Sequence, residues 1–284
     1  MFKITTIIVS ALLTASFILP SQAESVLDKI KRTGLLEVGI RDDAAPFGYR
    51  DRYNNLEGVC LDLINLIKEE IKKELSLDII SIKIYQSTLN NRFELVSNKR
   101  IDLECAYNTI THKPDANIDF SRPFFITGTQ FLVKKLERGK INIYRNLINV
   151  NIGVLRDTTT QQFIENRFPL AKVQTFQGQT ARSRGIQALQ RGRIDAFASD
   201  GILLIGEAVL LDLSIGDQYI LVPQTPLECS YYGLILPKDD PVWRDFINGV
   251  IGTKENRRIF RNWFSIITPY LKQVIQACPV NSQS

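Results

Sequence analysis

DLECAYNTITHKPDANIDFSRPFFITGTQFLV, residues 102–133, begins with the pattern of a strand, changes to small polar residues and ends in an aromatic run that predicts a second strand. Polar groups at the end of a strand commonly line a ligand crevice when the flanking chain returns to the core. A surface loop between two core strands is the simpler interpretation of this stretch alone. The segments on either side decide between the two.

The chain before this stretch alternates between predicted helices and strands. Residues 60–75 show the helical pattern clearly, since apolar side chains from Leu61 to Leu75 recur three or four positions apart. Residues 77–85 alternate between apolar and polar, as a half-buried strand does. In order, the predicted elements are a helix at 25–32, a strand at 36–40, a helix at 60–75, a strand at 77–85, a helix at 90–98 and a strand at 101–106. This β-α-β-α-β order is typical of an open, mainly parallel sheet.

The same order repeats after the aromatic run. The predicted elements are a strand at 149–155, a helix at 158–167, a strand at 172–176, a helix at 180–190 and a strand at 194–199 that ends at Asp200. Beyond them we expect a strand at 231–237, helices at 241–251 and 254–264, and a tail that continues through Cys278. Two half-chains with one order and no long linker predict an α/β fold of two similar lobes that face each other.

The N-terminus reads as a secretory signal peptide over residues 1–23. Lys3 gives a basic start, residues 4–19 an apolar core, and residues 21–23 a small-residue cleavage site. A transmembrane anchor is the alternative, which Pro20 and the small residues after it disfavour. No cysteine follows the apolar core, so lipid anchoring is not expected. We expect the remaining chain to be exported and soluble, with enough residues for two domains of ordinary size.

The charge distribution points away from nucleic acid as a partner. The chain has 35 Lys and Arg against 30 Asp and Glu, a net charge of +5, and its basic residues are spread out rather than gathered in a stripe with aromatic residues. This mild positive balance is compatible with an anionic or zwitterionic small ligand. With one His and no C-x-x-C spacing, neither a metal site nor another cofactor is expected.

Four cysteines lie far apart in the sequence: Cys60, Cys105, Cys229 and Cys278. In an exported chain they predict one or two disulfide bonds, and four cysteines allow three pairings. We favour Cys60–Cys105, because both residues are expected near strand and helix ends of one lobe, together with Cys229–Cys278. The other two pairings remain open at this point.

Eight segments of the sequence have a familiar order and spacing. They are LEVGIRDDAAPFGY, LEGVCLDLINLI, NRFELVSNKRIDLE, IDFSRPFFITGTQFLV, GVLRDTTT, ALQRGRIDAFASD, YYGLILPKDDP and IFRNWF. Together they resemble the extracytoplasmic solute-binding proteins of family 3, the polar amino-acid receptors of ABC transporters, over most of residues 35–264. The Arg after the first strand, the LNNR helix start and the DLEC strand look most like the glutamate/aspartate receptors of that family.

The resemblance implies a type II periplasmic binding protein, in which two α/β lobes close on a ligand. Each lobe would be an open, mainly parallel sheet with flanking helices, and two hinge strands near 131–135 and 232–237 would join the lobes. Lobe one would comprise residues 24–133 and, with the C-terminal helices, 231–284; lobe two would comprise residues 134–230. The implied partners are an amino-acid ligand and a membrane permease. The implied form is a monomer in the periplasm, without a cofactor.

An amino-acid receptor must hold an ammonium group, an α-carboxylate and one side chain. By the resemblance, Asp200 and the backbone carbonyl of Tyr107 accept hydrogen bonds from the ammonium group, and Thr109 reaches the α-carboxylate. Thr158 and Thr159 open a predicted helix, whose positive end is suited to an anion. Helix capping is the simpler role for Asp200 and for both threonines, and for the threonines the two roles can hold together.

Arg41 and Arg92 are assigned to a side-chain carboxylate of the ligand, by analogy with acidic amino-acid receptors. A guanidinium can grip a carboxylate with two parallel hydrogen bonds. A surface salt bridge is the alternative for each, and the adjacent Asp42 and Asp43 make it plausible for Arg41. Phe47 and Tyr49 stand where the family places aromatic residues around the pocket. Core packing is the alternative, and it is the more natural one for Phe47.

One position departs from the family pattern. The family carries an Arg five residues after the Thr109 position, where it clamps the α-carboxylate, and here that position is Pro114. Several substitutes remain open: Lys113 as a single charge, one of Arg41, Arg92 and Arg182, or a ligand that is not an ordinary α-amino acid. We expect the neighbouring His112 to be a surface or capping residue.

The function that follows is ligand capture, in which a polar, acidic amino acid is bound between closing lobes and passed to the permease. One alternative is an enzyme, since some relatives on this scaffold are cyclohexadienyl dehydratases that act on prephenate or arogenate. Another is a sensory protein that presents its ligand to a separate receptor. We assign no catalytic residue, because the sequence shows no Ser-His-Asp arrangement and no metal cluster, and we therefore do not expect an enzyme.

Overall fold

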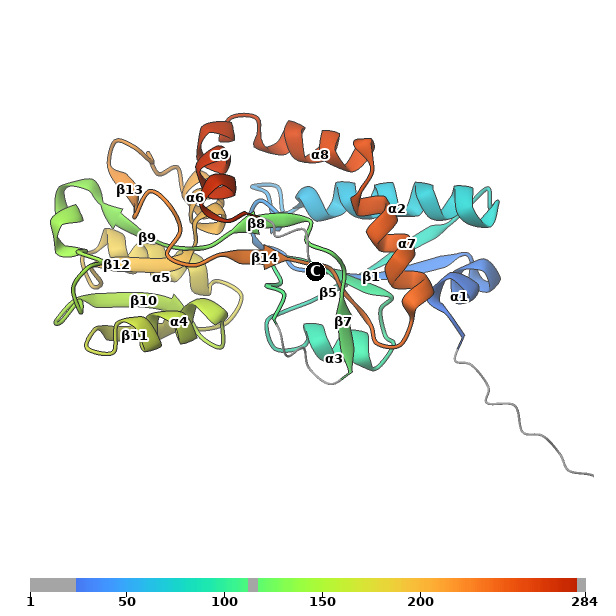
Figure 1. Cartoon of the computed structure of the whole chain (residues 1–284), viewed down its shortest axis with the longest axis horizontal. Coiled ribbons are helices and arrows are strands. Elements are labelled where there is room, and N and C mark those ends of the chain that lie inside the picture. The colour runs from blue at the N-terminus through green and yellow to red at the C-terminus, as the bar shows by residue number, and fades with distance from the viewer. Residues whose placement is uncertain (1–23, 112–116, 280–284) are drawn as a thin grey trace, which may run out of the picture.

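The computed structural model describes residues 24–111 and 117–279, and it shows two five-stranded sheets with helices packed against them, joined by a pair of strands (Figure 1). We call each sheet with its helices a lobe; lobe one holds the first sheet and lobe two the second. This two-lobed α/β architecture is the one expected from the sequence. The predicted signal peptide at 1–23 lies outside the described residues, as do His112, Lys113 and Pro114.

Lobe one is built on a sheet with the strand order β5-β1-β6-β15-β7. The strands are β1 (Leu35–Ile40), β5 (Ser81–Gln86), β6 (Leu103–Cys105), β7 (Ile118–Phe120) and β15 (Ile235–Pro237). β1 pairs in parallel with β5 and β6, as the alternating order predicts. β15 belongs to the returning chain and runs antiparallel to β6 and β7, which makes the sheet mixed.

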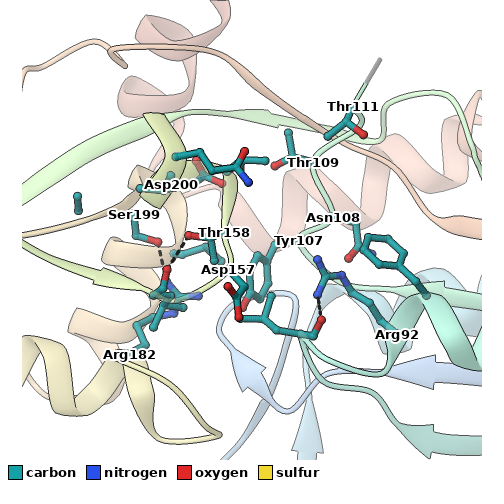
Figure 2. A pocket seen from close by; sticks show the side chains of 18 of the residues that line it. Arg92, Tyr107, Asn108, Thr109, Thr111, Asp157, Thr158, Arg182, Ser199 and Asp200 are labelled. Atoms are coloured by element: carbon teal, nitrogen blue, oxygen red, sulfur yellow. Dashed lines mark hydrogen bonds between the residues drawn. The ribbon is translucent and has the colours of Figure 1, made fainter. Parts of the chain in front are cut away.

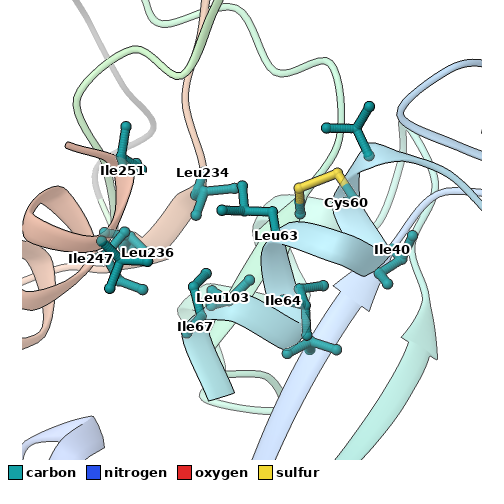
Figure 3. Packing of buried hydrophobic residues seen from close by; sticks show 14 of the residues in the cluster. Ile40, Cys60, Leu63, Ile64, Ile67, Leu103, Leu234, Leu236, Ile247 and Ile251 are labelled. Carbon is teal, nitrogen blue, oxygen red and sulfur yellow. A yellow bond between two sulfur atoms is a disulfide. The ribbon is translucent and has the colours of Figure 1, made fainter. Parts of the chain in front are cut away.

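Helix α2 (Val59–Leu75) buries one apolar face in the core of lobe one. Its buried side chains include Leu63, Ile64, Ile67 and Ile71, which share a cluster with residues of β6, β15 and α7 (Figure 3). Each fully buried Leu or Ile stabilises the fold by about 1.5–3 kcal/mol. The other helices of this lobe include α1 (Val26–Thr33), α3 (Arg92–Ser97), α7 (Pro241–Ile251) and α8 (Lys254–Phe264).

Lobe two is built on a sheet with the strand order β11-β10-β12-β9-β13. Its elements are β9 (Thr129–Lys134), the 3-10 helix η1 (Lys135–Lys140), β10 (Asn151–Leu155), α4 (Thr159–Arg167), β11 (Lys172–Phe176), α5 (Ala181–Gln190), β12 (Ala196–Asp200), α6 (Gly201–Leu210) and β13 (Tyr219–Val222). Neighbouring residues of β9 enter different clusters, since Phe131 packs with α4 and Leu132 packs with α5 and α6. Both faces of the sheet are therefore covered, as is usual for parallel strands.

Two short strands run between the lobes. β8 (Phe125–Thr127) and β14 (Ser230–Tyr232) pair antiparallel beside each other (Figure 1). The crossings were expected near 131–135 and 232–237, but β9 pairs with β12 and β13 inside lobe two, and β15 lies in the sheet of lobe one. A Cβ at Gly128, between β8 and β9, would collide with the carbonyl oxygen of Glu228. Glycine therefore allows the two passes of the chain to approach closely at this point.

The lobes also touch through a small antiparallel sheet that follows β1. Its strands are β2 (Asp43–Ala44), β3 (Gly48–Arg50) and β4 (Leu56–Glu57). Gly206 of α6 lies so close to this sheet that a Cβ would collide with the carbonyl oxygen of Ala45. Ile202 and Leu203, also in α6, belong to the core cluster of lobe one. The start of α6 is therefore packed against both lobes.

The chain after α8 forms a further helix, α9 (Thr268–Ala277), where a tail is expected from the sequence. That expectation was wrong. Pro269 stands in the first turn, where proline is well tolerated, and the helix buries Val274. α9 packs on β8, and the Tyr270 hydroxyl donates a hydrogen bond to Gln130 Oε1 in β9 at 2.8 Å. The C-terminal segment thus lies across the strands that join the lobes.

Both favoured disulfide bonds are confirmed. Cys60 and Cys105 are joined at an S–S distance of 2.07 Å and link α2 to β6 inside lobe one. Cys229 and Cys278 are joined at 2.02 Å and fasten the end of α9 to the residue before β14.

Candidate functional site

A cleft of about 360 Å³ lies between the lobes, where several parallel strands end (Figure 2). Open α/β sheets bind ligands at this edge. Lobe one contributes the segment after β6 and the start of α3, and lobe two contributes the segment after β10, the end of β12 and the start of α5. The cleft brings together seven of the predicted ligand residues: Arg92, Tyr107, Thr109, Thr158, Thr159, Arg182 and Asp200.

The ring of Tyr107 packs against two guanidinium groups. The Cζ atom of Arg41 lies 4.5 Å from the ring centroid and that of Arg182 lies 5.2 Å from it, both within the range of cation–π attraction. The hydroxyl of Tyr107 is buried and has no hydrogen-bond partner within 24–111 and 117–279. Burial raises the pKa of Tyr107, and Arg41 opposes the rise. The neutral phenol is therefore available to donate to an anionic ligand.

Arg182, in α5, is buried but incompletely paired. Its Nη1 donates to Ser199 Oγ at 2.6 Å, whereas Nε and Nη2 have no partner among the described residues. Nε and Nη2 form the edge with which a guanidinium grips a carboxylate side-on, and Arg41 uses the same two atoms on Asp43. An unsatisfied buried cation is costly, so Arg182 is suited to receive an anion.

Arg92, the first residue of α3, is a second incompletely paired cation. Its Nη1 donates to the carbonyl oxygen of Leu89, its Cζ lies 4.3 Å from the ring centroid of Phe93, and its Nε has no partner in the part of the chain that the structure describes. Burial lowers the pKa of Arg92, Glu104 opposes this effect, and repulsion from Arg41 adds to it. A bound anion would offset both the burial and the repulsion.

Asp200 ends β12 and is an acidic residue of the cleft. Its Oδ1 accepts a hydrogen bond from Ser230 Oγ at 3.1 Å, and its Oδ2 accepts one from the Tyr232 hydroxyl. Burial raises the pKa of Asp200, while these hydrogen bonds and the charge of Arg182 oppose the rise. Asp200 occupies the N-cap position of α6, but its side chain makes no capping hydrogen bond. Helix capping, the simpler role considered for Asp200 from the sequence, is therefore not what its side chain does.

Thr158 does cap its helix. Its Oγ1 accepts a hydrogen bond from the Gln161 N–H at 3.2 Å and donates to the carbonyl oxygen of Leu155 at 2.8 Å. Thr159 and Thr160 follow as the first residues of α4 and also line the cleft. The first N–H groups of a helix lack intrahelical acceptors, and the positive helix end favours anions. Capping and anion binding are compatible here.

Three other residues of the predicted site do not line the cleft, and a fourth is not among the described residues. Arg41 is only 2% exposed and donates from Nε and Nη2 to Asp43 at 2.8 and 2.5 Å, so it forms a buried ion pair behind Tyr107. Phe47 packs among aromatic rings in the core of lobe one. Tyr49 lies in β3, opposite Asp43. Lys113 lies outside the described residues.

The cleft also contains residues that the sequence did not single out. They include Leu89, Phe93, Asn108, Phe120, Asp157, Ser199 and Leu203. Asn108, Asp157 and Ser199 each adjoin a predicted site residue in the chain, and that adjacency was a usable signal. Asn108 is held from behind, because its Nδ2 donates to Glu104 Oε2 while Glu104 Oε1 accepts from Ser87 Oγ at 2.7 Å. Burial raises the pKa of Glu104.

No helix within 24–111 or 117–279 is both long and apolar enough to cross a membrane. In the same ranges, no three or more His, Cys, Asp or Glu side chains are grouped as a metal site would need.

A two-lobed α/β fold with a polar cleft between the lobes defines a class, the extracytoplasmic solute-binding proteins. The profile of the bacterial extracellular solute-binding proteins, family 3, matches residues 36–266. The chain therefore belongs to that family.

Named relatives agree with this assignment. The glutamate/aspartate import solute-binding protein of Escherichia coli is 30% identical over 244 residues, which cover 85% of this chain and 79% of that protein. The L-glutamate/L-aspartate-binding protein of Pseudomonas aeruginosa is 29% identical over 269 residues, which cover 92% of this chain and 87% of that protein.

Solved structures support the fold. Holo ArgBP from T. maritima matches with a TM-score of 0.66 and 25% identity, over 84% of this chain and 99% of that chain. The ancestral amino acid-binding protein AncCDT-1, a precursor of cyclohexadienyl dehydratase, matches with a TM-score of 0.70 and 23% identity, over 85% of this chain and 100% of that chain.

Proposed function

We propose that this protein is the substrate-binding subunit of an ABC transporter and that it captures an acidic amino acid in the periplasm as a monomer. The observation that carries the proposal is the pair of cleft guanidiniums: Nε of Arg92 and both Nε and Nη2 of Arg182 are buried without a partner among the described residues. Buried polar groups are normally hydrogen-bonded, so unpaired cationic donors that line a cleft call for an anionic ligand.

Each part of an acidic amino acid has a partner in the cleft. The ammonium group binds Asp200 and the backbone carbonyl of Tyr107. The α-carboxylate binds Thr109 and the start of α4, at Thr158 and Thr159, which stand in for the clamp that Pro114 replaces. The side-chain carboxylate then binds the guanidiniums of Arg92 and Arg182, together with the unpaired hydroxyl of Tyr107.

The arrangement of charges also separates acidic from basic ligands. The Escherichia coli and Pseudomonas aeruginosa relatives are named for glutamate and aspartate, whereas the solved T. maritima neighbour is named for arginine. A basic side chain would bring a third cation beside Arg92 and Arg182. Like charges at such short range are destabilising, so we propose that this cleft excludes basic amino acids.

Ligand binding would couple to closure because the cleft draws on both lobes. An amino acid that contacts Thr109 in lobe one and Asp200 in lobe two favours the state in which those residues are close. An apolar contact acts in the same direction, since Leu89 of lobe one packs against the Leu132–Phe197 cluster of lobe two.

Isothermal titration of the ligand-free protein against the proteinogenic amino acids tests the proposal. We expect glutamate or aspartate to bind and arginine and lysine not to. Asp200→Asn should abolish binding, because it removes the charge opposite the ammonium group while keeping the side-chain size. Binding of no amino acid, or turnover of prephenate or arogenate by the purified protein, would reject the proposal. N-terminal sequencing of the protein from a periplasmic extract tests the signal peptide, which should end at Ala23.

A further inference from the structure

A second cavity of about 240 Å³ adjoins the cleft. Leu89 and Asp157 line both spaces, so these two residues form the boundary between them. Both lobes contribute to the second cavity, which is lined mainly by Arg41, Gln86, Thr88, Asn90, Gln177 and Gln179. This cavity therefore exists as an enclosed space only while the lobes are together.

A hydrogen bond between the lobes closes one side of the second cavity. Gln179 Nε2 of lobe two donates to Asp42 Oδ1 of lobe one at 3.0 Å. Asp42 also accepts from Gln86 Nε2 at 3.0 Å, so two amides meet on one carboxylate. These contacts, made by the exposed side chains of Gln86 and Gln179, join the two lobes at this side of the cavity.

The second cavity is suited to an amide and a carboxylate. Its lining is rich in carboxamides and hydroxyls, which can both donate to and accept from a peptide group. Its charged lining residues are Arg41 and Arg156 against Asp42, Asp43 and Asp157; Arg41 holds Asp43 with two donors, and Arg50 contacts Asp42 at 3.2 Å. One donor is left over, because Arg41 is 2% exposed and its Nη1 has no partner in the described chain. An anionic group in this cavity would satisfy that donor.

The position of the second cavity relates it to the ligand's side chain. Asp200 and Thr109, which would hold the ammonium and α-carboxylate, line only the main cleft. Arg92 donates to the carbonyl oxygen of Leu89, one of the two boundary residues. In Figure 2, Arg92 and Asp157 lie on the side of the cleft away from Asp200 and Thr109. A ligand that extends beyond its side-chain carbonyl would therefore enter the second cavity.

We propose that the second cavity is a subsite for a residue joined to the ligand's side-chain carboxyl through an amide bond, so that the protein takes γ-glutamyl peptides as well as free glutamate. This inference rests on the proposed amino-acid function. The side-chain carbonyl keeps its contact with Arg92, the new amide meets the carboxamides of Asn90 and Gln177, and the terminal carboxylate reaches Arg41 Nη1. The main cleft alone is already within the range of about 300–1,000 Å³ that holds drug-sized ligands, which leaves room for such an extension.

Titration calorimetry with three compounds tests the subsite: glutamate, γ-glutamylglycine and its isomer α-glutamylglycine. We expect the γ-linked dipeptide to bind and the α-linked isomer not to, because the isomer blocks the α-carboxylate. Gln177→Ala should weaken γ-glutamylglycine roughly 3- to 10-fold, the loss of one hydrogen bond, and leave glutamate unchanged. Gln190→Ala, at the exposed end of α5, is the matched control and should change neither affinity.

Each other outcome overturns the inference in a distinguishable way. Binding of glutamate without γ-glutamylglycine would reject the subsite and leave the proposed function standing. Equal effects of Gln177→Ala on both ligands would reject the assigned position of the extension. Binding of none of the three compounds, or of any other amino acid, would reject the proposed function and the subsite together.

Discussion

Replacing Arg182 by methionine should weaken ligand binding without destabilising the empty protein. In the wild type, Nε and Nη2 of Arg182 are buried without partners, and we propose that a ligand carboxylate fills both. Hydrogen bonds to charged groups contribute about 1.5–3 kcal/mol each. Two bonds at the lower value give about 3 kcal/mol, and each 1.4 kcal/mol is about a tenfold change in affinity. Arg182→Met should therefore bind glutamate about 100-fold more weakly.

The stability of the empty protein should respond differently. In the wild type, burying a cation with two unsatisfied donors lowers the free energy of unfolding. The hydrogen bond to Ser199 and the contact with Tyr107 offset part of this loss of stability. Methionine fills much of the same space without a charge, and such replacements of buried ions are often neutral or stabilising. We expect the free energy of unfolding of ligand-free Arg182→Met to lie within about 1 kcal/mol of the wild type or above it.

Isothermal titration with glutamate and denaturant unfolding without ligand measure the two effects separately. Arg191→Met, at the exposed C-cap of the same helix, is the control and should change neither. The reasoning is refuted if Arg182→Met binds glutamate within about threefold of the wild type. It is also refuted if the ligand-free variant loses several kcal/mol, because Arg182 would then be a structural rather than a ligand-binding residue.

Three further predictions concern pH, the second disulfide and closure. Burial raises the pKa of half-buried Glu228 from 4.5 to about 7, so the folded protein binds one more proton than the unfolded chain between pH 4.5 and 7. The free energy of unfolding should therefore fall by about 1–2 kcal/mol as pH rises through that range, after allowing for solvent screening, and stay level above it. The loss of stability between pH 5 and pH 8 should be smaller in Glu228→Gln than in the wild type by this amount, since Asp200 and Glu104, whose pKa values burial also raises, remain in both. Serine at Cys229 and Cys278, which are 49 residues apart, should reduce the free energy of unfolding by about 2–4 kcal/mol, and an unchanged melting temperature would contradict this. Gly206→Ala should hold the lobes apart and weaken ligand binding by about 1–3 kcal/mol in a titration, whereas Gly249→Ala, with open space around it, should not.

The fold could be predicted well where one short segment determines one element. The apolar spacing in α2 and the alternation in β5 follow from local patterns, and the repeated strand–helix order gives two parallel half-sheets. The segment 125–134 (FITGTQFLVK) was harder, because its pattern does not reveal that Gly128 divides it into two strands in different sheets. α9 was missed because its packing partners, β8 and Cys229, lie far away in the sequence.

The site shows the same limit. Residues next to strand ends, such as Asp200 and Tyr107, could be placed because the end of a parallel strand fixes their position. Arg41 could not, because nothing in the sequence decides whether a guanidinium turns towards a ligand or back to an aspartate two residues away. In the structure, Arg41 forms an ion pair with Asp43, whereas Arg92 and Arg182 are incompletely paired.

The contact of Leu89 with lobe two affects how closely the closed state of the protein depends on a bound ligand. That apolar contact does not depend on the ligand, so by itself it would let the empty protein close; under the proposed function, a closed but empty protein could then engage the transporter without a ligand. The unpaired guanidinium donors act in the opposite direction, because closing without an anion brings Arg182 and Arg92 into one cleft while their buried donors stay unpaired. The charges proposed to select the ligand would therefore also disfavour closure of the empty protein. The balance between the Leu89 contact and the guanidiniums would set the fraction of empty protein that is closed.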